Sequence, residues 1–437
     1  MHCPFTNHRF RFTNSFVKDS TTLISGNVVA QGIAFGSYFL LTRLYSPEVF
    51  GLLNIFYSYI EVLIIASTCK YELATVVADN EREASAVAHF ALRMNTFVSI
   101  LLLCIILICK LMGWHVGKLG NGSITLLIPP MVFFSGTTRV YASLYNRFRA
   151  FSTITASNVT GAVGAACLKI FLGLSFVGKG LHNLGLSIGT VVGQAAANIS
   201  YLLRLKKLNL PKKISQKEML AAARHHRRFA FFTAPKEFVN SLSANLPLIY
   251  LPIALSVDNA QVGLFALAYT FALRPVNLIN NAFEQALYVR LSERVRAQQP
   301  MVHDLFRFLG VVNLIALPVV VVGFLFAEPI MTWCFGNEWN GCGIYMRCLI
   351  PFAWLQLSAT SLSCIANVFS RQRVEFLFFM VLFVLRIIAL SIGIAHNSFI
   401  LAIALFALAG CCLLGILLAW YIRLAIHHDH SLMVNSD

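Results

Sequence analysis

Nine charged side chains lie inside, or near the ends of, stretches of sequence that are otherwise apolar. Two are acidic, Glu61 and Glu237, and the basic ones are Arg43, Arg139, Lys169, Lys236, Arg274, Arg347 and Arg386. A charge at the centre of a membrane helix costs roughly 2.5–3.5 kcal/mol on insertion scales and marks a substrate or ion path. Arginine forks match phosphate oxygens in a bidentate manner. The positive surplus therefore predicts a wet passage for an anionic cargo.

The basic side chains divide by depth into two expected roles. Those expected to contact an anionic headgroup directly are Arg139, Lys236, Arg274 and Arg386, and those expected to attract it from the periphery are Arg347 and Lys169. Residues within about six positions of a span end, such as Arg347, can instead extend to the interface. Arg139, Lys236 and Glu237 can instead belong to a structural ion pair within one bundle.

The two acidic side chains are candidates for ion coupling. Glu61 lies about ten residues inside its apolar stretch, and Glu237 follows Lys236 directly. Protonation of Glu61 would open and close a pair with Arg274, which couples cargo movement to an ion gradient. This hypothesis predicts that a Glu61→Gln variant loses the normal pH dependence of transport.

Long apolar stretches position these charges. Hydrophobic residues make up 58% of the 437 residues and charged residues only 12%, whereas soluble domains are about one quarter charged. A helix needs about 20 apolar residues to cross the bilayer. Twelve stretches qualify: 22–44, 51–69, 94–114, 124–145, 152–175, 184–203, 229–255, 263–283, 308–327, 342–366, 377–395 and 399–422. Their continuous apolar character predicts helices rather than a β-barrel.

Basic residues outside these stretches orient the chain. Twenty-four lie in the two termini and in every second connection, and only Lys110, Lys118 and Lys179 lie in the alternate connections. The positive-inside rule then places both termini in the cytoplasm. The net charge of +16 follows this topology, so we expect an anionic leaflet as neighbour and no nucleic-acid partner.

A weak internal repeat divides the chain into two similar parts. A shift of 212 residues aligns Gly51-Leu52 with Gly263-Leu264, and Tyr57-Ser58 with Tyr269-Thr270. An even number of spans in each half predicts a parallel repeat, as in some secondary transporters. The expected organisation is an all-α membrane protein with two six-helix bundles around a central cavity. The expected segments are an N-tail (1–21), a first bundle (22–203), a basic linker (204–228), a second bundle (229–422) and a C-tail (423–437).

Prolines interrupt the seventh and eighth predicted spans. Pro235, Pro247 and Pro252 lie in one, and Pro275 follows Arg274 in the other. Proline removes a backbone donor and bends a helix. We expect these two spans to bend and to gate the cavity, with static kinking as the alternative.

Several motifs resemble those of one transporter family. They are Phe16-Val17-Lys18-Asp19, Ser25-Gly26-Asn27, the run from Arg43 to Gly51 (RLYSPEVFG), Lys70-Tyr71-Glu72-Leu73-Ala74, Asn240-Ser241-Leu242-Ser243 and Phe335-Gly336 with Trp339. Together these residues resemble the Wzx-type lipid-linked oligosaccharide flippases. That family belongs to the multidrug/oligosaccharidyl-lipid/polysaccharide exporter superfamily.

The resemblance implies a function that composition alone does not give. It implies alternating access and transport of undecaprenyl-pyrophosphate-linked oligosaccharide from the cytoplasmic to the periplasmic leaflet of the bacterial inner membrane. The pathway would be O-antigen, lipopolysaccharide, capsule or exopolysaccharide synthesis. A polysaccharide polymerase and a chain-length regulator would be partners. A multidrug or small-metabolite antiporter of the same superfamily remains the alternative.

Other classes find less support in the sequence. No Walker-type phosphate loop or Cys-x-x-Cys pair is present, so neither an enzyme activity nor a cofactor is expected. A membrane enzyme that polymerises sugars would need a larger extracytoplasmic loop, and a scaffold would not need deep charges. Cys334 and Cys342 share one connection, where free thiols are favoured over a disulfide. His427, His428 and His430 are expected in a solvated tail, without a metal.

Overall fold

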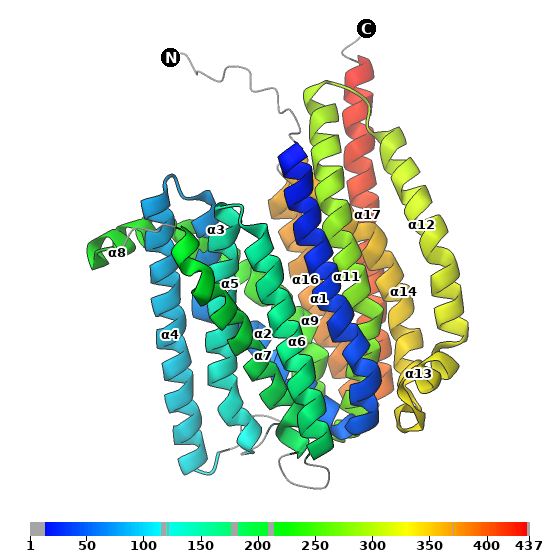
Figure 1. Cartoon of the computed structure of the whole chain (residues 1–437). Helices are drawn as coiled ribbons and strands as arrows, with labels where there is room; N and C mark the ends of the chain where they lie inside the picture. Colours follow the sequence, from blue (N-terminus) through cyan, green and yellow to red (C-terminus); the bar gives the residue numbers. More distant parts are fainter. Residues whose placement is uncertain are drawn as a thin grey trace. The chain divides into compact units, whose positions relative to one another are not determined.

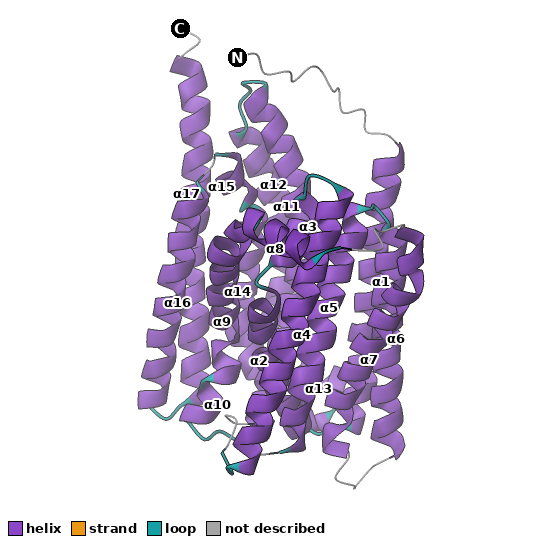
Figure 2. Cartoon of the chain, turned by 90° about the vertical axis from the view of Figure 1, so that its left-hand side faces the viewer, coloured by secondary structure: helices purple, strands orange, loops and turns teal. Residues whose placement is uncertain are grey.

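The computed structural model describes residues 14–114, 119, 122–175, 182–208, 214–369 and 371–434. The described part of the chain consists of helices and connecting loops, without strands (Figure 2). An all-α fold is therefore confirmed. Lys118 and Lys179, on which part of the topology prediction rests, lie outside these residues.

The helices follow one another with short connections (Figure 1). They are α1 (Asn14–Leu44), α2 (Pro47–Thr68), α3 (Tyr71–Val77), α4 (Glu81–Leu111), η2 (Ser123–Leu127), α5 (Ile128–Arg147), α6 (Phe151–Ser175), α7 (His182–Arg204), η3 (Leu205–Leu208), α8 (Gln216–His225), η4 (Phe229–Thr233), α9 (Ala234–Ile249), α10 (Leu251–Ala254), α11 (Asn259–Arg296), α12 (Val302–Leu325), α13 (Ala327–Phe335), η5 (Asn337–Trp339), α14 (Cys342–Ser361), α15 (Cys364–Val368), α16 (Gln372–Ala395) and α17 (Phe399–Val434).

Each of the twelve predicted spans coincides with helical structure. Within the described residues, nine helices are long and apolar enough to cross a membrane. The other three predicted spans correspond to α1, whose described apolar part is Val28–Leu44, to α5, and to the broken segment from η4 to α10. The chain is therefore a multi-pass membrane protein.

The seventh predicted span is broken, whereas the eighth continues. The segment begins with a π-helical turn, η4, and continues as α9, which ends at Ile249 just after Pro247. Pro252 occupies the first turn of the short helix α10, where a missing backbone donor costs little. Pro275, in contrast, lies inside the uninterrupted helix α11. A gating movement at these prolines stays a prediction.

The chain divides into two compact units. The first comprises Met1–Leu41, Leu63–Ile108 and Leu126–Ala234, and the second Thr42–Val62, Cys109–Thr125 and Pro235–Asp437. In the first unit α6 packs along α7, and α5 packs against both α3 and α7. In the second unit α14 packs against α11, α12 and α17, and α16 packs along α17. The bundle boundaries expected from the sequence stay a prediction.

The core of the second unit joins two of the motif segments. Trp339 is fully buried, and its indole Nε1 donates to the main-chain oxygen of Thr42 at 3.0 Å. Its ring meets that of Phe50 edge to face, with centroids 5.0 Å apart. Gly336 and Gly341 flank this turn with φ of 104° and 90°, a region that glycine adopts without strain.

The C-terminal segment is more ordered than the sequence suggests. Helix α17 continues to Val434, and Asp429 is buried within its last turns. The Asp429 carboxylate accepts from the backbone N–H groups of Met301 and Val302 at 2.9 Å, where α12 begins. The expected C-tail is thus helical as far as Val434, and Asp429 satisfies otherwise unpaired donors at a helix N-terminus. His427 and His430 are exposed on this helix, as expected, whereas His428 is half-buried.

Candidate functional site

The eight charged residues with a predicted role in cargo binding or ion coupling fall in both units. Arg139 on α5 and Lys169 on α6 belong to the first unit. The second unit holds the other six predicted residues: Glu61 on α2, Lys236 and Glu237 on α9, Arg274 on α11, Arg347 on α14 and Arg386 on α16.

Arg386 is the most buried of these side chains, with 6% of its surface exposed. Its guanidinium carbon lies 4.2 Å from the ring centroid of Phe406 and 5.4 Å from that of Phe352. One terminal nitrogen donates to the hydroxyl of Ser243 at 3.1 Å, and Nε has no hydrogen-bond partner among the described residues. No carboxylate pairs with Arg386 in the described chain. It is therefore a buried cation held by aromatic faces rather than by an anion.

Arg274 lies on α11 near the same group of residues. Tyr269 lies five residues earlier on the same helix. The Tyr269 hydroxyl donates to the main-chain oxygen of Ala244 on α9 at 3.5 Å. Arg274 is exposed, in contrast to Arg386. A joint role of Arg274 and Arg386 in headgroup contact stays a prediction.

Lys236 is paired with an acidic residue that sequence reasoning missed. Lys236 Nζ lies 4.0 Å from a carboxylate oxygen of Glu375, and the Tyr421 hydroxyl donates to the other oxygen at 2.5 Å. Glu375 is only 5% exposed, although it precedes the predicted span 377–395. Helix α16 begins at Gln372, which carries Glu375 into the interior. The short distance between Glu375 and the start of the apolar stretch is the signal that could have identified it.

Glu61 and Glu237 occupy less enclosed positions. Glu61 is exposed on α2, and its main-chain oxygen accepts from the Ser241 hydroxyl of α9 at 3.3 Å. Glu237 is half-buried in the first turn of α9. The contact with Ser241 joins α2 to α9 through a residue of the Asn240–Ser243 motif. Ion coupling through either glutamate stays a prediction.

A seam of polar side chains between α11, α12 and α14 was also missed. Asn280 donates to the Thr360 hydroxyl and accepts from Ser361 at 2.8 Å. Near it, Asn313 accepts from Trp354 Nε1 at 2.8 Å and from Ser358 at 3.2 Å. Neutral amides and hydroxyls commonly form hydrogen bonds between membrane helices. A few of them do not interrupt an apolar stretch, so the hydropathy pattern did not indicate this seam.

Arg347 has a structural position. Its guanidinium donates to the main-chain oxygens of Phe324 and Leu325, at 3.2 and 3.4 Å. These are among the last carbonyls of α12, which lack partners within the helix. Arg347 is exposed, so this capping role coexists with the predicted peripheral attraction.

The first-unit residues lie among small and polar side chains. Arg139 is half-buried on α5, next to Thr138, which donates to Gln194 on α7 at 3.3 Å. The stem of Lys169 on α6 lies against Gly189 of α7, where any side chain would collide with it. The structure therefore positions Lys169 at the contact between α6 and α7.

The cysteines agree with the prediction of free thiols. Cys334 and Cys342 are both unpaired, and Cys342 is buried with its sulfur 3.2 Å from the main-chain oxygen of Leu264. In the C-terminal helix His428 lies 3.2 Å from Asp429, the residue that caps α12.

Comparison with known proteins places the fold. A family profile described as "Polysaccharide biosynthesis protein" matches residues 40–343. A search of curated proteins returned no match. Among solved structures, the lipid II flippase MurJ in an inward closed conformation aligns with a TM-score of 0.68 and 12% identity, covering 96% of this chain and 91% of that chain.

Two further solved structures extend the similarity. An inward-facing MATE-family multidrug resistance transporter of the MOP superfamily aligns with a TM-score of 0.62 at 12% identity, covering 93% of this chain and 96% of its own. A MOP-superfamily transporter from Pyrococcus furiosus aligns with a TM-score of 0.63 at 13% identity, over 93% and 95%. The chain thus has the twelve-helix fold of these transporters, as the resemblance implied. The family match, which spans most of its length, shows that the chain belongs to the polysaccharide biosynthesis protein family.

Proposed function

We propose that this protein is a flippase that moves undecaprenyl-pyrophosphate-linked oligosaccharide from the cytoplasmic to the periplasmic leaflet. The setting is surface polysaccharide synthesis, of O-antigen, capsule or exopolysaccharide type, in a bacterial inner membrane with both termini cytoplasmic. The single observation that carries the proposal is Arg386, a buried guanidinium without a carboxylate partner among the described residues.

The unpaired charge of Arg386 supports an anionic cargo, because its aromatic contacts offset only part of the free-energy cost of burying it. Burying an unpaired charge costs several kcal/mol even after relaxation, and contact with an aromatic face returns about 2 kcal/mol. An anionic ligand that binds Arg386 would offset the rest of this cost. A pyrophosphate oxygen offers acceptors for the guanidinium N–H groups, including Nε, which has no partner within the described residues.

A cation antiporter of the same fold fits the second unit less well. Its cargo would require a carboxylate that serves no other purpose. The buried carboxylate of Glu375 is already occupied by Lys236 and Tyr421, and we assign the exposed Glu61 and the half-buried Glu237 to ion coupling. We further propose that Arg139, Lys236 and Arg274 contact the headgroup during transport, and that Glu61 and Glu237 couple it to an ion gradient. A polymerase and a chain-length regulator would act on the delivered units.

Deletion of the coding sequence tests the proposal, in strains with and without the initiating sugar-phosphate transferase. We expect lipid-linked repeat units to accumulate in the cytoplasmic leaflet only when the transferase is present. Surface polysaccharide should fall in parallel. If the deletion strain kept its surface polysaccharide and changed its resistance to cationic drugs, the proposal would be wrong and an antiporter function would be favoured.

A further inference from the structure

The amphipathic helix α8 forms one wall of a cationic cavity against α4. Ser215 begins α8 with a capping box: its hydroxyl accepts from Glu218 N at 3.2 Å, and Glu218 accepts from Ser215 N at 2.7 Å. The buried face of α8, Met219, Ala222 and Ala223, belongs to one apolar cluster with residues of α3, α4 and α5. Helix α8 therefore lies across the end of α4 as a fixed element (Figure 1).

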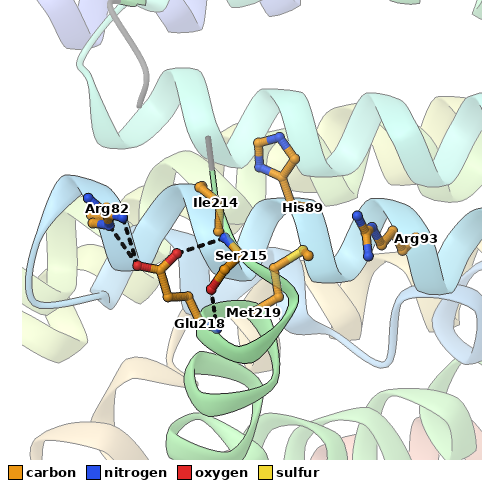
Figure 3. Close-up of a pocket in the computed structure, with 7 residues that line it drawn as sticks. All are labelled: Arg82, His89, Arg93, Ile214, Ser215, Glu218 and Met219. Atoms are coloured by element: carbon orange, nitrogen blue, oxygen red, sulfur yellow. Dashed lines mark hydrogen bonds and ion pairs between the residues drawn. The ribbon is translucent and has the colours of Figure 1, made fainter. Parts of the chain in front are cut away.

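Polar contacts fix the same junction at both ends of α8. Arg82 of α4 donates to the Glu218 carboxylate at 2.9 Å. At the other end His226 Nε2 lies 3.2 Å from a carboxylate oxygen of Glu83. The cavity of about 630 Å³ beside the first contact is lined by Arg82, His89, Arg93, Ile214, Ser215, Glu218 and Met219 (Figure 3).

The cavity has a net positive charge, because its one carboxylate is paired and one arginine is left over. Arg82 and Glu218 neutralise each other, and Glu218 also completes the capping box. Arg93 is exposed and has no hydrogen-bond or ion-pair partner among the described residues. His89 uses Nδ1 to donate to the main-chain oxygen of Ser85 at 2.7 Å, which leaves Nε2 as an acceptor for a hydroxyl group of a ligand. Figure 3 shows both side chains on the α4 face that borders the cavity.

An exposed apolar stripe continues from these two side chains along the same face of α4. His89, Arg93, Ile100, Leu107 and Leu111 recur at helical spacing, so they share one side of the helix. Ile100 is 56% exposed and Leu111 88%. Helix α4 has 31 residues, about 46 Å at 1.5 Å per residue, whereas the hydrocarbon core is about 30 Å thick. If Leu111 lies at one boundary, Arg93 lies at the other.

We infer that the α4–α8 cavity binds the phosphate of an anionic membrane phospholipid, whose acyl chains lie along the exposed stripe of α4. The phosphodiester accepts from Arg93, a hydroxyl group of the lipid headgroup donates to Nε2 of His89, and Ile100 and Leu107 contact the chains. The segment that follows α8 exposes two aromatic side chains, Phe231 and Phe232, beside Arg227 and Arg228. Aromatic and basic side chains together are typical of segments at the lipid headgroup boundary. This inference is independent of the cargo proposed above.

Lipid titration of the purified full-length protein, followed by native mass spectrometry, tests the inference. Phosphatidylglycerol and phosphatidylcholine are compared with wild type and with a His89→Gln/Arg93→Gln double variant. We expect the double variant to bind phosphatidylglycerol about tenfold more weakly, since charge-assisted hydrogen bonds are lost. Phosphatidylcholine binding should be weaker in wild type and unchanged by the variant.

The matched control is Arg307→Gln. Arg307 is an exposed arginine on α12 that also precedes exposed apolar residues, Val311 and Leu314, and its loss changes the net charge equally. Its affinity for phosphatidylglycerol should stay within about twofold of wild type. Three results would overturn the inference: an equal effect of Arg307→Gln, equal binding of both lipids, or displacement of the lipid by soluble glycerol 3-phosphate at similar affinity. Arg93→Lys, which keeps the charge, serves if the double variant misfolds, and it should retain most of the binding.

Discussion

Gly51 and Gly263, which the 212-residue shift aligns, pack against each other. A Cβ built on Gly51 would lie 3.1 Å from the backbone nitrogen of Gly263, and a Cβ built on Gly263 would lie 3.1 Å from that of Gly51. Each would also overlap a carbonyl oxygen of the opposite helix, from Asn259 and Pro47 respectively. Reciprocal contact of equivalent residues is the signature of a two-fold relation. The weak sequence repeat thus marks a close contact between α2 and α11.

Alanine at either glycine should destabilise the protein. Because the obstructing atoms belong to backbone, the two helices must move apart, and overpacking of this kind costs about 1–3 kcal/mol. Gly310→Ala on α12 is the control, since a Cβ there meets no atom within 4 Å. Thermal denaturation in detergent should show a lower midpoint for Gly51→Ala and Gly263→Ala only. Wild-type midpoints for both would mean that the helices are not in close contact.

The sequence predicted the spans well because hydropathy is a property of a local stretch. The partners of the charged side chains, in contrast, depend on contacts between distant segments. Glu375 meets Tyr421, 46 residues later, and Arg347 meets carbonyls 22 and 23 residues earlier. Neither partner follows from periodicity. Short helices such as α8 were missed as well, because ten residues give no membrane-span signal.

Removal of the buried charge at Arg386 should separate function from stability. In an Arg386→Met variant an apolar side chain replaces an unpaired cation between Phe352 and Phe406, and sulfur packs favourably against aromatic rings. We expect an unchanged or higher melting midpoint together with loss of surface polysaccharide in a complementation assay. Arg307→Met, an exposed arginine, should leave both unchanged.

A lower melting midpoint for Arg386→Met with transport retained would assign Arg386 a structural role. Arg386→Lys adds a second measure, since lysine keeps the charge and loses the planar fork. Transport by Arg386→Lys should fall below wild type but stay above that of Arg386→Met.

The Lys236–Glu375 pair should behave as a coupled unit in a double-mutant cycle. Lys236→Met leaves the buried Glu375 carboxylate with Tyr421 alone, and we expect a loss of about 1 kcal/mol, because the Lys236 side chain is 38% exposed and water screens the pair. Adding Glu375→Gln should recover much of that loss. Chemical denaturation of the four proteins in detergent provides the comparison, and strictly additive effects would show that the two groups do not interact.

The order of α8 should depend on pH through Glu218. The backbone N–H of Ser215 donates to this carboxylate, and the Arg82 guanidinium contributes further, so the pKa of Glu218 lies below its usual 4.5. A lowered folded-state pKa means that the stabilisation is complete above the unfolded value and is lost as pH falls through the folded one. A spin label at the exposed position Ala221 should therefore report a constant, immobile α8 from pH 7 to about 5, and increasing mobility below pH 4.5. Glu218→Gln should abolish this rise in mobility at low pH. The control is Glu293→Gln, which removes an exposed carboxylate on α11 and should preserve the rise. A rise that persists in Glu218→Gln would assign the transition to another group.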